Sequence, residues 1–157
     1  MEAIWNRPEI IAHTQLLARS LKHLTKRDLL AGLEVNVPPA EYSEKIFHAP
    51  CVLVSHGIEA DPVLNYGNAA ALALWEMSWA EFTATASRLT AEAPNREERA
   101  RLLAAVAANG FIDDYSGIRI SKNGRRFRIA QATVWNLISA DSKACGQAAM
   151  FSSWEFL

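Results

Sequence analysis

The stretch from Asp61 to Phe82, DPVLNYGNAAALALWEMSWAEF, decides the fold. It predicts a short strand, a glycine turn and two short helices. Asn68 follows the turn and can cap the first helix, because its side chain accepts from backbone N–H groups that otherwise lack partners. Ser78 and Glu81 have the spacing of a capping box at the second helix. The helix over residues 69–75 is apolar nearly all round, so we expect it to be buried on more than one side.

Strand signals flank this stretch on both sides. Two short strands, 51–54 and 63–66, precede the helices, and the chain becomes strand-rich after residue 110. Asn123-Gly124 predicts a type I′ hairpin, and a second hairpin turns at residues 141–143. Two strands, a run of helices and three long antiparallel strands make an α+β order. This order fits a five-stranded antiparallel sheet with helices packed on one face.

The first 38 residues read as a separate helical part. Residues 5–34 predict two helical segments, and Pro38-Pro39 interrupts the pattern. We therefore divide the chain into an N-terminal helical extension, residues 1–38, and a main domain, residues 39–157. The apolar stripe of the extension, which includes Leu17 and Leu21, is larger than one helix needs, and this predicts a homodimer surface.

Five short segments carry a family resemblance. They are SHG at 55–57, DPVLNYGN at 61–68, SRLTAE at 87–92, DDYSGIRIS at 113–121 and RRFRIAQATVWN at 125–136. Together they resemble the MEKHLA-type family of PAS-like domains, over roughly residues 47–155. The resemblance implies a PAS-like fold and a role in sensing or in controlling assembly. These motifs differ from those of the flavin-binding and haem-binding PAS relatives.

Composition limits the classes of function. The 157 residues are half apolar with a net charge of −1, which indicates one globular domain and gives no argument for nucleic acid as a partner. No apolar run approaches 18 residues, so we expect no membrane span. The N-terminus lacks the apolar block of a secretory signal, which predicts a cytoplasmic location. Two cysteines in such a chain are expected to be reduced thiols.

The predicted fourth strand is the best candidate for a ligand site. Strict alternation puts Phe127, Gln131, Thr133 and Trp135 on one face, and we expect this bulkier face to point at the helices. A buried amide that lacks a partner costs about 1–3 kcal/mol, so Gln131 and Thr133 would fix a small ligand in a cavity. Alternatively, they bond to backbone or water, or the faces are reversed. The full set of candidate pocket residues is Gln131, Thr133, Trp135, Phe127, Tyr66, Trp75, Trp79, Tyr115 and His56.

Metal and cofactor chemistry has little support in the sequence. No histidine pair has helical ligand spacing beside a carboxylate, and no Cys-x-x-Cys occurs, so we predict no metal site. A histidine at a strand end, such as His56, is more often structural than a haem ligand. A flavin photoadduct needs a cysteine in a helix beside the ring, and residues 68–110 contain none. Haem and flavin are therefore disfavoured, and the cofactor stays unknown.

Catalysis is also disfavoured. Asp113 and Asp114 are neighbours on a predicted strand, so we expect them to point to opposite faces and to share no proton. No nucleophile elbow or phosphate loop is present. A small α+β enzyme would need an acid–base pair in the cavity, for example His56 or Asp113 facing Gln131. We predict no catalytic residue.

A local basic cluster surrounds the Asn123-Gly124 hairpin: Arg119, Lys122, Arg125, Arg126 and Arg128. A solvated hairpin is the simplest interpretation, and an acidic partner is the alternative. The leading hypothesis is a non-catalytic ligand-sensing and interaction module that forms a homodimer and acts through a protein partner. The rivals are a purely structural dimerisation module with a self-filled core and the small enzyme.

Overall fold

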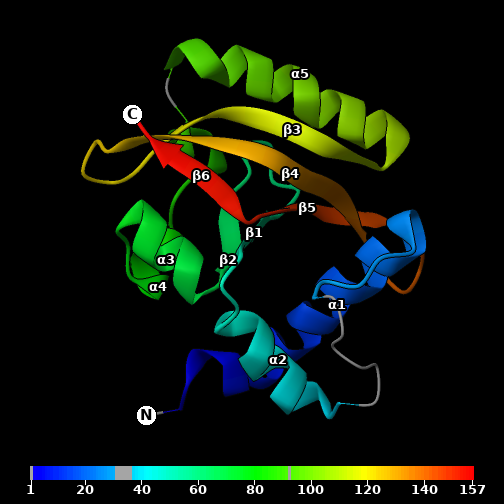
Figure 1. The fold of residues 1–157 in the computed structure, drawn as a ribbon. Coiled ribbons are helices and arrows are strands. Elements are labelled where there is room, and N and C mark those ends of the chain that lie inside the picture. Colours follow the sequence, from blue (N-terminus) through cyan, green and yellow to red (C-terminus); the bar gives the residue numbers. More distant parts are fainter. Residues whose placement is uncertain (1, 31–36, 92) are drawn as a thin grey trace.

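An antiparallel sheet forms the centre of the molecule (Figure 1). The computed structural model describes residues 2–30, 37–91 and 93–157, apart from the side chains at 93–95 and 98. Its main strands follow the order β2-β1-β5-β4-β3, and the short β6 pairs with β4. The strands are β1 (Val52–His56), β2 (Leu64–Gly67), β3 (Phe111–Ile120), β4 (Arg126–Ile138), β5 (Ala144–Phe151) and β6 (Ser153–Phe156). The predicted α+β fold with a five-stranded sheet is confirmed, and β6 is an addition to it.

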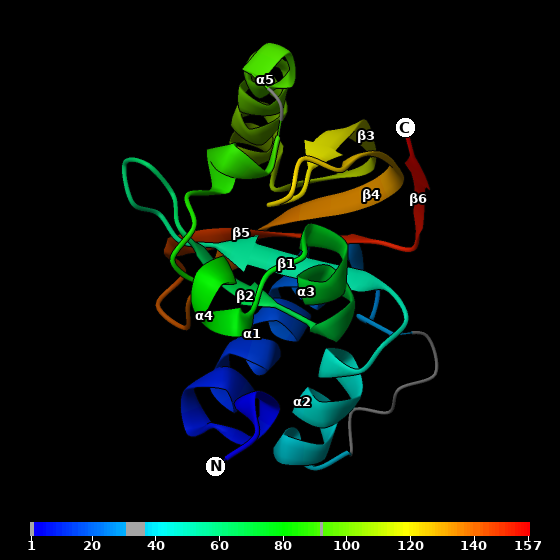
Figure 2. The ribbon, with the colours of Figure 1, turned by 90° about the vertical axis from the view of Figure 1, so that its left-hand side faces the viewer.

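Helices cover both faces of the sheet (Figure 2). One face carries α3 (Ala69–Trp75), α4 (Trp79–Phe82), the 3-10 turn η2 (Ser87–Thr90) and α5 (Ala93–Asn109). The other face carries α1 (Pro8–Thr25) and α2 (Pro39–Phe47), which follow the 3-10 turn η1 (Ile4–Asn6). The molecule therefore has two apolar cores, one on each side of the sheet, whereas the sequence predicted helices on one face only.

The side chain of Asn68 joins four segments of the chain. Its Oδ1 accepts from the N–H groups of Ala71 at 3.2 Å and Leu53 at 3.1 Å. Its Nδ2 donates to the carbonyls of Cys51 at 2.8 Å and Ile46 at 3.2 Å. Asn68 is fully buried, so each of these bonds is made away from water. The predicted cap of α3 is confirmed, and the same amide also holds the end of α2 and the start of β1.

The predicted capping box at α4 is present as well. Ser78 Oγ accepts from the N–H of Glu81, and Glu81 Oε1 accepts from the N–H of Ser78 at 3.0 Å. The Asn123-Gly124 hairpin differs from the prediction. Gly124 has φ +86°, but Asn123 has no positive φ, and a type I′ turn needs both. Ser121 instead accepts from Gly124 N–H and donates to Arg125 O, which closes a three-residue loop.

Strict alternation along β4 is wrong, because the strand contains a bulge. Gly117 pairs with Ile129 and Tyr115 pairs with Ala132, so β4 has one residue more than β3 between these pairs. Gln131 absorbs the extra residue with φ +54° and is exposed to solvent. Beyond the bulge the alternation is reversed. Phe127 and Ile129 therefore face α3 and α5, whereas Trp135 and Leu137 face α1.

The N-terminal part differs from the prediction in two respects. Only one helix, α1, forms between residues 8 and 30, because Lys26 takes a left-handed conformation that ends it. The remainder of the predicted second segment, 31–34, lies outside the described residues. Leu17 and Leu21 are buried in this chain's own core beside Trp135 and Leu137. The stripe that suggested a dimer surface is thus used internally, and homodimer formation stays a prediction, as does the domain boundary at residue 38.

A polar contact fastens α1 to the sheet beneath it. His13 Nε2 lies 2.8 Å from Ser55 Oγ, and this hydroxyl donates to Asn65 Oδ1 at 2.5 Å. The His13 ring also lies against Tyr66, with 5.8 Å between the ring centroids. Burial lowers the pKa of His13 from 6.5 to about 4. The imidazole is therefore neutral in the folded protein at neutral pH.

Loss of the Asn68 amide should destabilise the whole fold. Asn68→Asp keeps one acceptor oxygen but removes both N–H donors and points a second oxygen at the carbonyls of Ile46 and Cys51. We expect a loss of at least about 2 kcal/mol in the free energy of unfolding, measured in urea. The control, Ser78→Ala, removes an exposed cap and should cost about 1 kcal/mol. An Asn68→Asp variant as stable as the control would contradict this role.

Stability should decline as the pH falls from 6.5 to 4. The pKa of His13 is lower in the folded than in the unfolded chain, so the unfolded state binds the proton first in this window. His56 shifts in the same direction, because burial lowers its pKa. His13→Gln should remove about 2 kcal/mol of this decline, measured by urea unfolding at several pH values. The control, His23→Gln, lies at an exposed position on the same helix and should show the same decline as the native protein. If His13→Gln also declines as the native protein does, the prediction is wrong.

Candidate functional site

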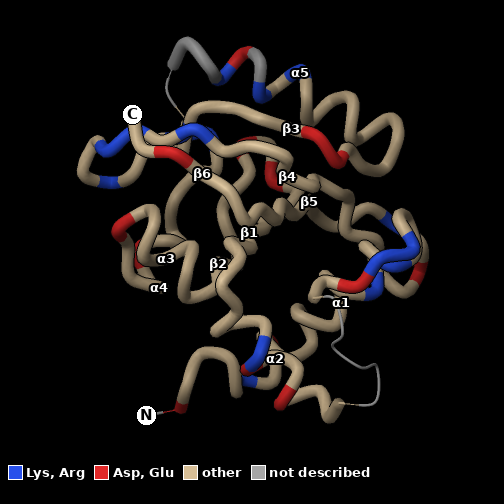
Figure 3. Tube along the Cα trace, viewed as in Figure 1, with Lys and Arg blue, Asp and Glu red and all other residues tan. Residues whose placement is uncertain are grey.

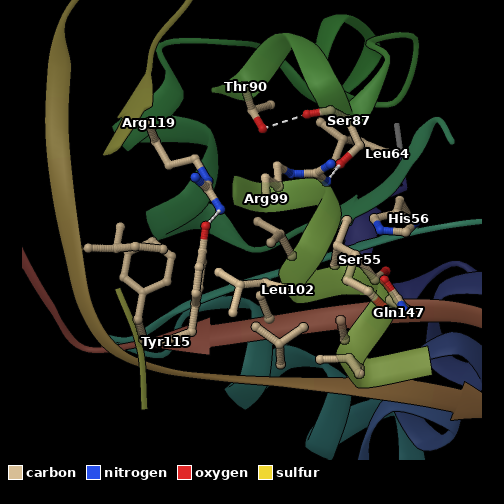
Figure 4. A pocket seen from close by; sticks show the side chains of 18 of the residues that line it. Ser55, His56, Leu64, Ser87, Thr90, Arg99, Leu102, Tyr115, Arg119 and Gln147 are labelled. Atoms are coloured by element: carbon tan, nitrogen blue, oxygen red, sulfur yellow. Dashed lines mark hydrogen bonds between the residues drawn. The ribbon is translucent and has the colours of Figure 1, made fainter. Parts of the chain in front are cut away.

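A cavity of about 70 Å³ lies between the sheet and the cover formed by η2 and α5 (Figure 4). Most of its lining is aliphatic or aromatic, with side chains from β1, β3, β4, β5, α3 and α5. This volume has room for several water molecules or for one small organic molecule. Among the described residues, no Asp or Glu lines the cavity, whereas Arg99, Arg119 and His56 do.

Arg119 turns inward from β3. It is 7% exposed, and its Nη2 donates to the hydroxyl of Tyr115 at 2.5 Å while Nη1 donates to the carbonyl of Ile118 at 3.1 Å. The guanidinium carbon lies 5.2 Å from the centroid of the Tyr115 ring. A Cβ on Gly117 would come within 2.6 Å of Tyr115 Oη and 3.2 Å of Arg119 Nη1. The glycine between the two residues therefore leaves the space that their contact needs.

Arg99 reaches the same end of the cavity from α5. Figure 4 shows its guanidinium beside Ser87 and near that of Arg119, with the apolar side chain of Leu102 farther along the wall. Arg99 Nη2 donates to Ser87 Oγ, and Thr90 Oγ1 donates to the carbonyl of Ser87 at 2.7 Å. Burial, followed by the positive charge of Arg119, lowers the pKa of Arg99 to about 10. Two cations thus share one end of the cavity.

Two lining residues have a buried polar atom without a partner among the described residues: His56 and Trp75. His56 Nδ1 lies 2.8 Å from the carbonyl of Gly57, so this nitrogen carries the proton and Nε2 is an acceptor. Trp75 Nε1 is a donor. Buried polar atoms in native proteins are nearly always hydrogen-bonded, so both call for an explanation. Between them they could serve a ligand that carries one donor and one acceptor.

Three of the predicted pocket residues line this cavity together: His56, Trp75 and Tyr115. Phe127 lies in the same core, with its ring centroid 5.2 Å from that of Trp75, but is outside the lining. Gln131 is exposed at the bulge and contributes nothing to the cavity. Its predicted inward position is wrong, because the extra residue in β4 turns it out.

The other four candidates lie on the opposite face of the sheet or outside the cavity: Thr133, Trp135, Tyr66 and Trp79. Trp135 Nε1 donates to the carbonyl of Leu17 at 3.2 Å, and Arg27 Nη2 lies 3.5 Å from Thr133 Oγ1. The rings of Tyr66 and Trp79 meet edge to face at 5.8 Å. These side chains join α1 and α4 to the sheet instead of lining the cavity.

Sequence reasoning missed both arginines of the cavity. Arg119 was grouped with the solvated hairpin, where Lys and Arg do gather (Figure 3). Lys122 of that hairpin pairs with Glu81, and Arg125 lies over the Phe156 ring at 3.5 Å. Period-two spacing from Tyr115 to Gly117 to Arg119 was the available signal, since it puts Arg119 on the buried face of β3. Nothing local in the sequence of α5 marks Arg99.

The cavity does not fit the cofactor chemistry of flavin adducts or catalysis by paired carboxylates. Neither Cys51 nor Cys145 lines it, so no thiol is in place for a flavin adduct. Asp113 and Asp114 are both exposed, beside a second irregularity in β3. Within the described residues, no three His, Cys, Asp or Glu side chains form a metal-binding group. No helix in this part of the chain is long and apolar enough to cross a bilayer.

Comparisons with known proteins agree with the fold described above. The family model described as the MEKHLA domain matches residues 11–156. Comparison with curated proteins gives no match. Among solved structures, the PAS domain of a protein from Colwellia psychrerythraea has a TM-score of 0.63 at 10% identity, covering 74% of this chain and 94% of that chain.

Two further structures have the same fold. An RNA-binding light-oxygen-voltage receptor matches with a TM-score of 0.64 and 16% identity, over 80% of this chain but only 36% of the receptor. The PAS domain, in complex with ethanol, of a LuxR-family transcriptional regulator from Burkholderia thailandensis has a TM-score of 0.55 and 20% identity, over 74% and 96% of the two chains. At these identities the likeness establishes the PAS-like fold.

Gly117→Ala should disturb the Tyr115–Arg119 contact. Alanine normally suits a strand better than glycine by about 0.5–1 kcal/mol, but here its Cβ would meet the Tyr115 hydroxyl. We expect Gly117→Ala to lower the free energy of unfolding by about 1 kcal/mol, and to lower it less in a Tyr115→Phe background that lacks the hydroxyl. Urea unfolding of the four proteins in this cycle measures the coupling. Equal costs in both backgrounds would refute the steric explanation.

Proposed function

The chain belongs to the MEKHLA domain family, and from this premise we propose that it is a non-catalytic, PAS-like sensory module that binds a small molecule in the cavity beneath α5. The fold is that of PAS-like sensory domains, and the cavity lies between its sheet and its helices. The ligand would then be enclosed by residues from both layers.

The observation that carries this proposal is a pair of buried polar atoms, His56 Nε2 and Trp75 Nε1, which have no partner among the described residues and lie in a mostly apolar lining. A cavity that served only packing would be lined by apolar groups, because an unmade hydrogen bond costs about 1–3 kcal/mol. A ligand with suitable polar groups would recover part of this cost. Binding would also hold α5 and η2 against the sheet, which gives the domain two states for a partner to distinguish.

Two rival functions have less support. A structural module with a self-filled core would have no reason to keep these two polar atoms unpaired. A small enzyme would need an acid–base pair, and no carboxylate lines the cavity among the described residues. Homodimerisation remains compatible with ligand sensing, because a dimer could transmit the change to a protein partner. It would require a surface other than the buried stripe of α1.

Filling the cavity should abolish ligand binding without unfolding the protein. Ala149 lines the cavity from β5, and Ala149→Leu adds three carbons to the apolar wall. A library of small fragments should contain compounds that raise the melting temperature of the native protein by about 3–5 °C at ten times Kd. The same compounds should leave Ala149→Leu unaffected. Differential scanning fluorimetry makes the comparison.

The control is Ala107→Leu, at an exposed position on α5. It adds the same carbons outside the cavity and should respond to ligands as the native protein does. Native mass spectrometry of each protein, before and after denaturation, tests whether a molecule is already bound on purification. The proposal fails if no compound binds, or if compounds stabilise all three proteins equally, since the binding would then be elsewhere.

A further inference from the structure

We infer that the cavity takes a small organic monocarboxylate with a compact apolar body, whose carboxylate lies between Arg99 and Arg119. This inference rests on the proposed function and names the class of ligand for the same site. It is carried by three features of the cavity: one buried and one half-buried arginine at one end, Arg119 and Arg99, no acidic side chain among the described lining residues, and a mostly apolar remainder.

Among the described residues, the charges at this end of the cavity are unbalanced. Buried arginines in proteins are generally paired with an anion, because a charge removed from water is costly unless it is compensated. The hydrogen bonds of Arg119 go to a tyrosine hydroxyl and a backbone carbonyl, and that of Arg99 goes to a serine hydroxyl. None of the ion pairs formed between described residues includes either arginine. Their mutual repulsion makes an anion between them favourable.

A carboxylate suits the donors that remain. Each guanidinium has five N–H groups in a planar fork, and the hydrogen bonds described above use two on Arg119 and one on Arg99. Two carboxylate oxygens can accept from both forks at once. A neutral carbonyl group on a ligand would bind these N–H groups less tightly, because hydrogen bonds to charged acceptors are stronger.

The rest of the wall selects an organic acid over an inorganic anion. Beyond the arginines the cavity is lined by Leu102, Leu103, Val106 and Ile129. Phosphate and sulfate have no apolar group that could be buried against these side chains. The volume of about 70 Å³ restricts the body of the acid to a few carbon atoms, such as an ethyl or isopropyl group, because a cavity that holds one benzene ring has about 150 Å³. A hydroxyl on that body could reach a polar atom such as His56 Nε2, which lacks a partner in the described chain.

Isothermal titration calorimetry with matched probes tests the ligand class. Propionate is compared with propionamide, which has nearly the same shape without the charge, and with sulfate, which has charge without an apolar body. Isobutyrate and its amide form a second pair. We expect each acid to bind at least 10-fold more tightly than its amide, and sulfate to bind weakly or not at all.

Substitutions then locate the carboxylate. Arg119→Gln and Arg99→Gln should each weaken the binding of propionate by about 10- to 100-fold and leave that of propionamide nearly unchanged. The matched control is Arg128→Gln, at an exposed position on β4, which should bind propionate as the native protein does. Should Arg119→Gln fail to fold, Arg119→Lys keeps the charge without the fork, and the acid–amide comparison in the native protein still decides.

Each other outcome overturns the inference. Equal binding of acids and amides, or equal losses in Arg128→Gln, would remove the role of the two arginines while the sensor proposal survives. Sulfate binding as tight as that of propionate would indicate an inorganic anion site. If neutral fragments bind in the cavity and no acid does, the ligand class is wrong and the function stands. If neither acids nor any fragment bind, both proposals fail.

Discussion

One fully buried amide, that of Asn68, joins the sheet to a helix on each of its faces. Asn68 accepts from the first turn of α3 and from β1, and it donates to carbonyls at the end of α2 and just before β1. Because all four bonds are made without water, the relative positions of these segments are fixed within narrow limits. The helix that Asn68 caps ends at Trp75, which forms part of the cavity wall. The position of that wall thus depends on an interaction at the other end of a seven-residue helix.

Local signals in the sequence predicted the starts of α3 and α4 well, because a helix cap depends on residues within four positions of one another. The α3 cap and the capping box at α4 needed no tertiary information. The β4 bulge did, because Gln131 adopts φ +54° only in response to pairing with β3. Period-two alternation cannot detect one inserted residue, and a single error of this kind reverses every side chain after it. It therefore misplaced Gln131, Thr133 and Trp135 together.

The bulge also explains how one long strand serves two cores. Before it, β4 packs against α3 and α5, where the cavity lies; after it, alternate residues face α1, while Val134 still contributes to the cavity. Candidate residues chosen for aromatic character alone were thus divided between the two faces. The sequence analysis did not identify Arg119 as a cavity residue, because arginines near a hairpin are usually solvated. Gly117 was the informative neighbour, since it leaves room for Arg119 to fold back over Tyr115.

A ligand carboxylate bound as inferred would contact α5 through Arg99 and β3 through Arg119. Ligand binding would thereby be coupled to the packing of α5 against the sheet. The most direct test is a crystal structure of the protein with dichloroacetate, a compact acid about the size of isobutyrate, because the anomalous signal of chlorine locates the ligand. The account predicts both chlorine atoms inside the cavity beneath α5, with the carboxylate within hydrogen-bond distance of Arg99 and Arg119. Chlorine at the surface, or a carboxylate turned away from both arginines, would contradict it.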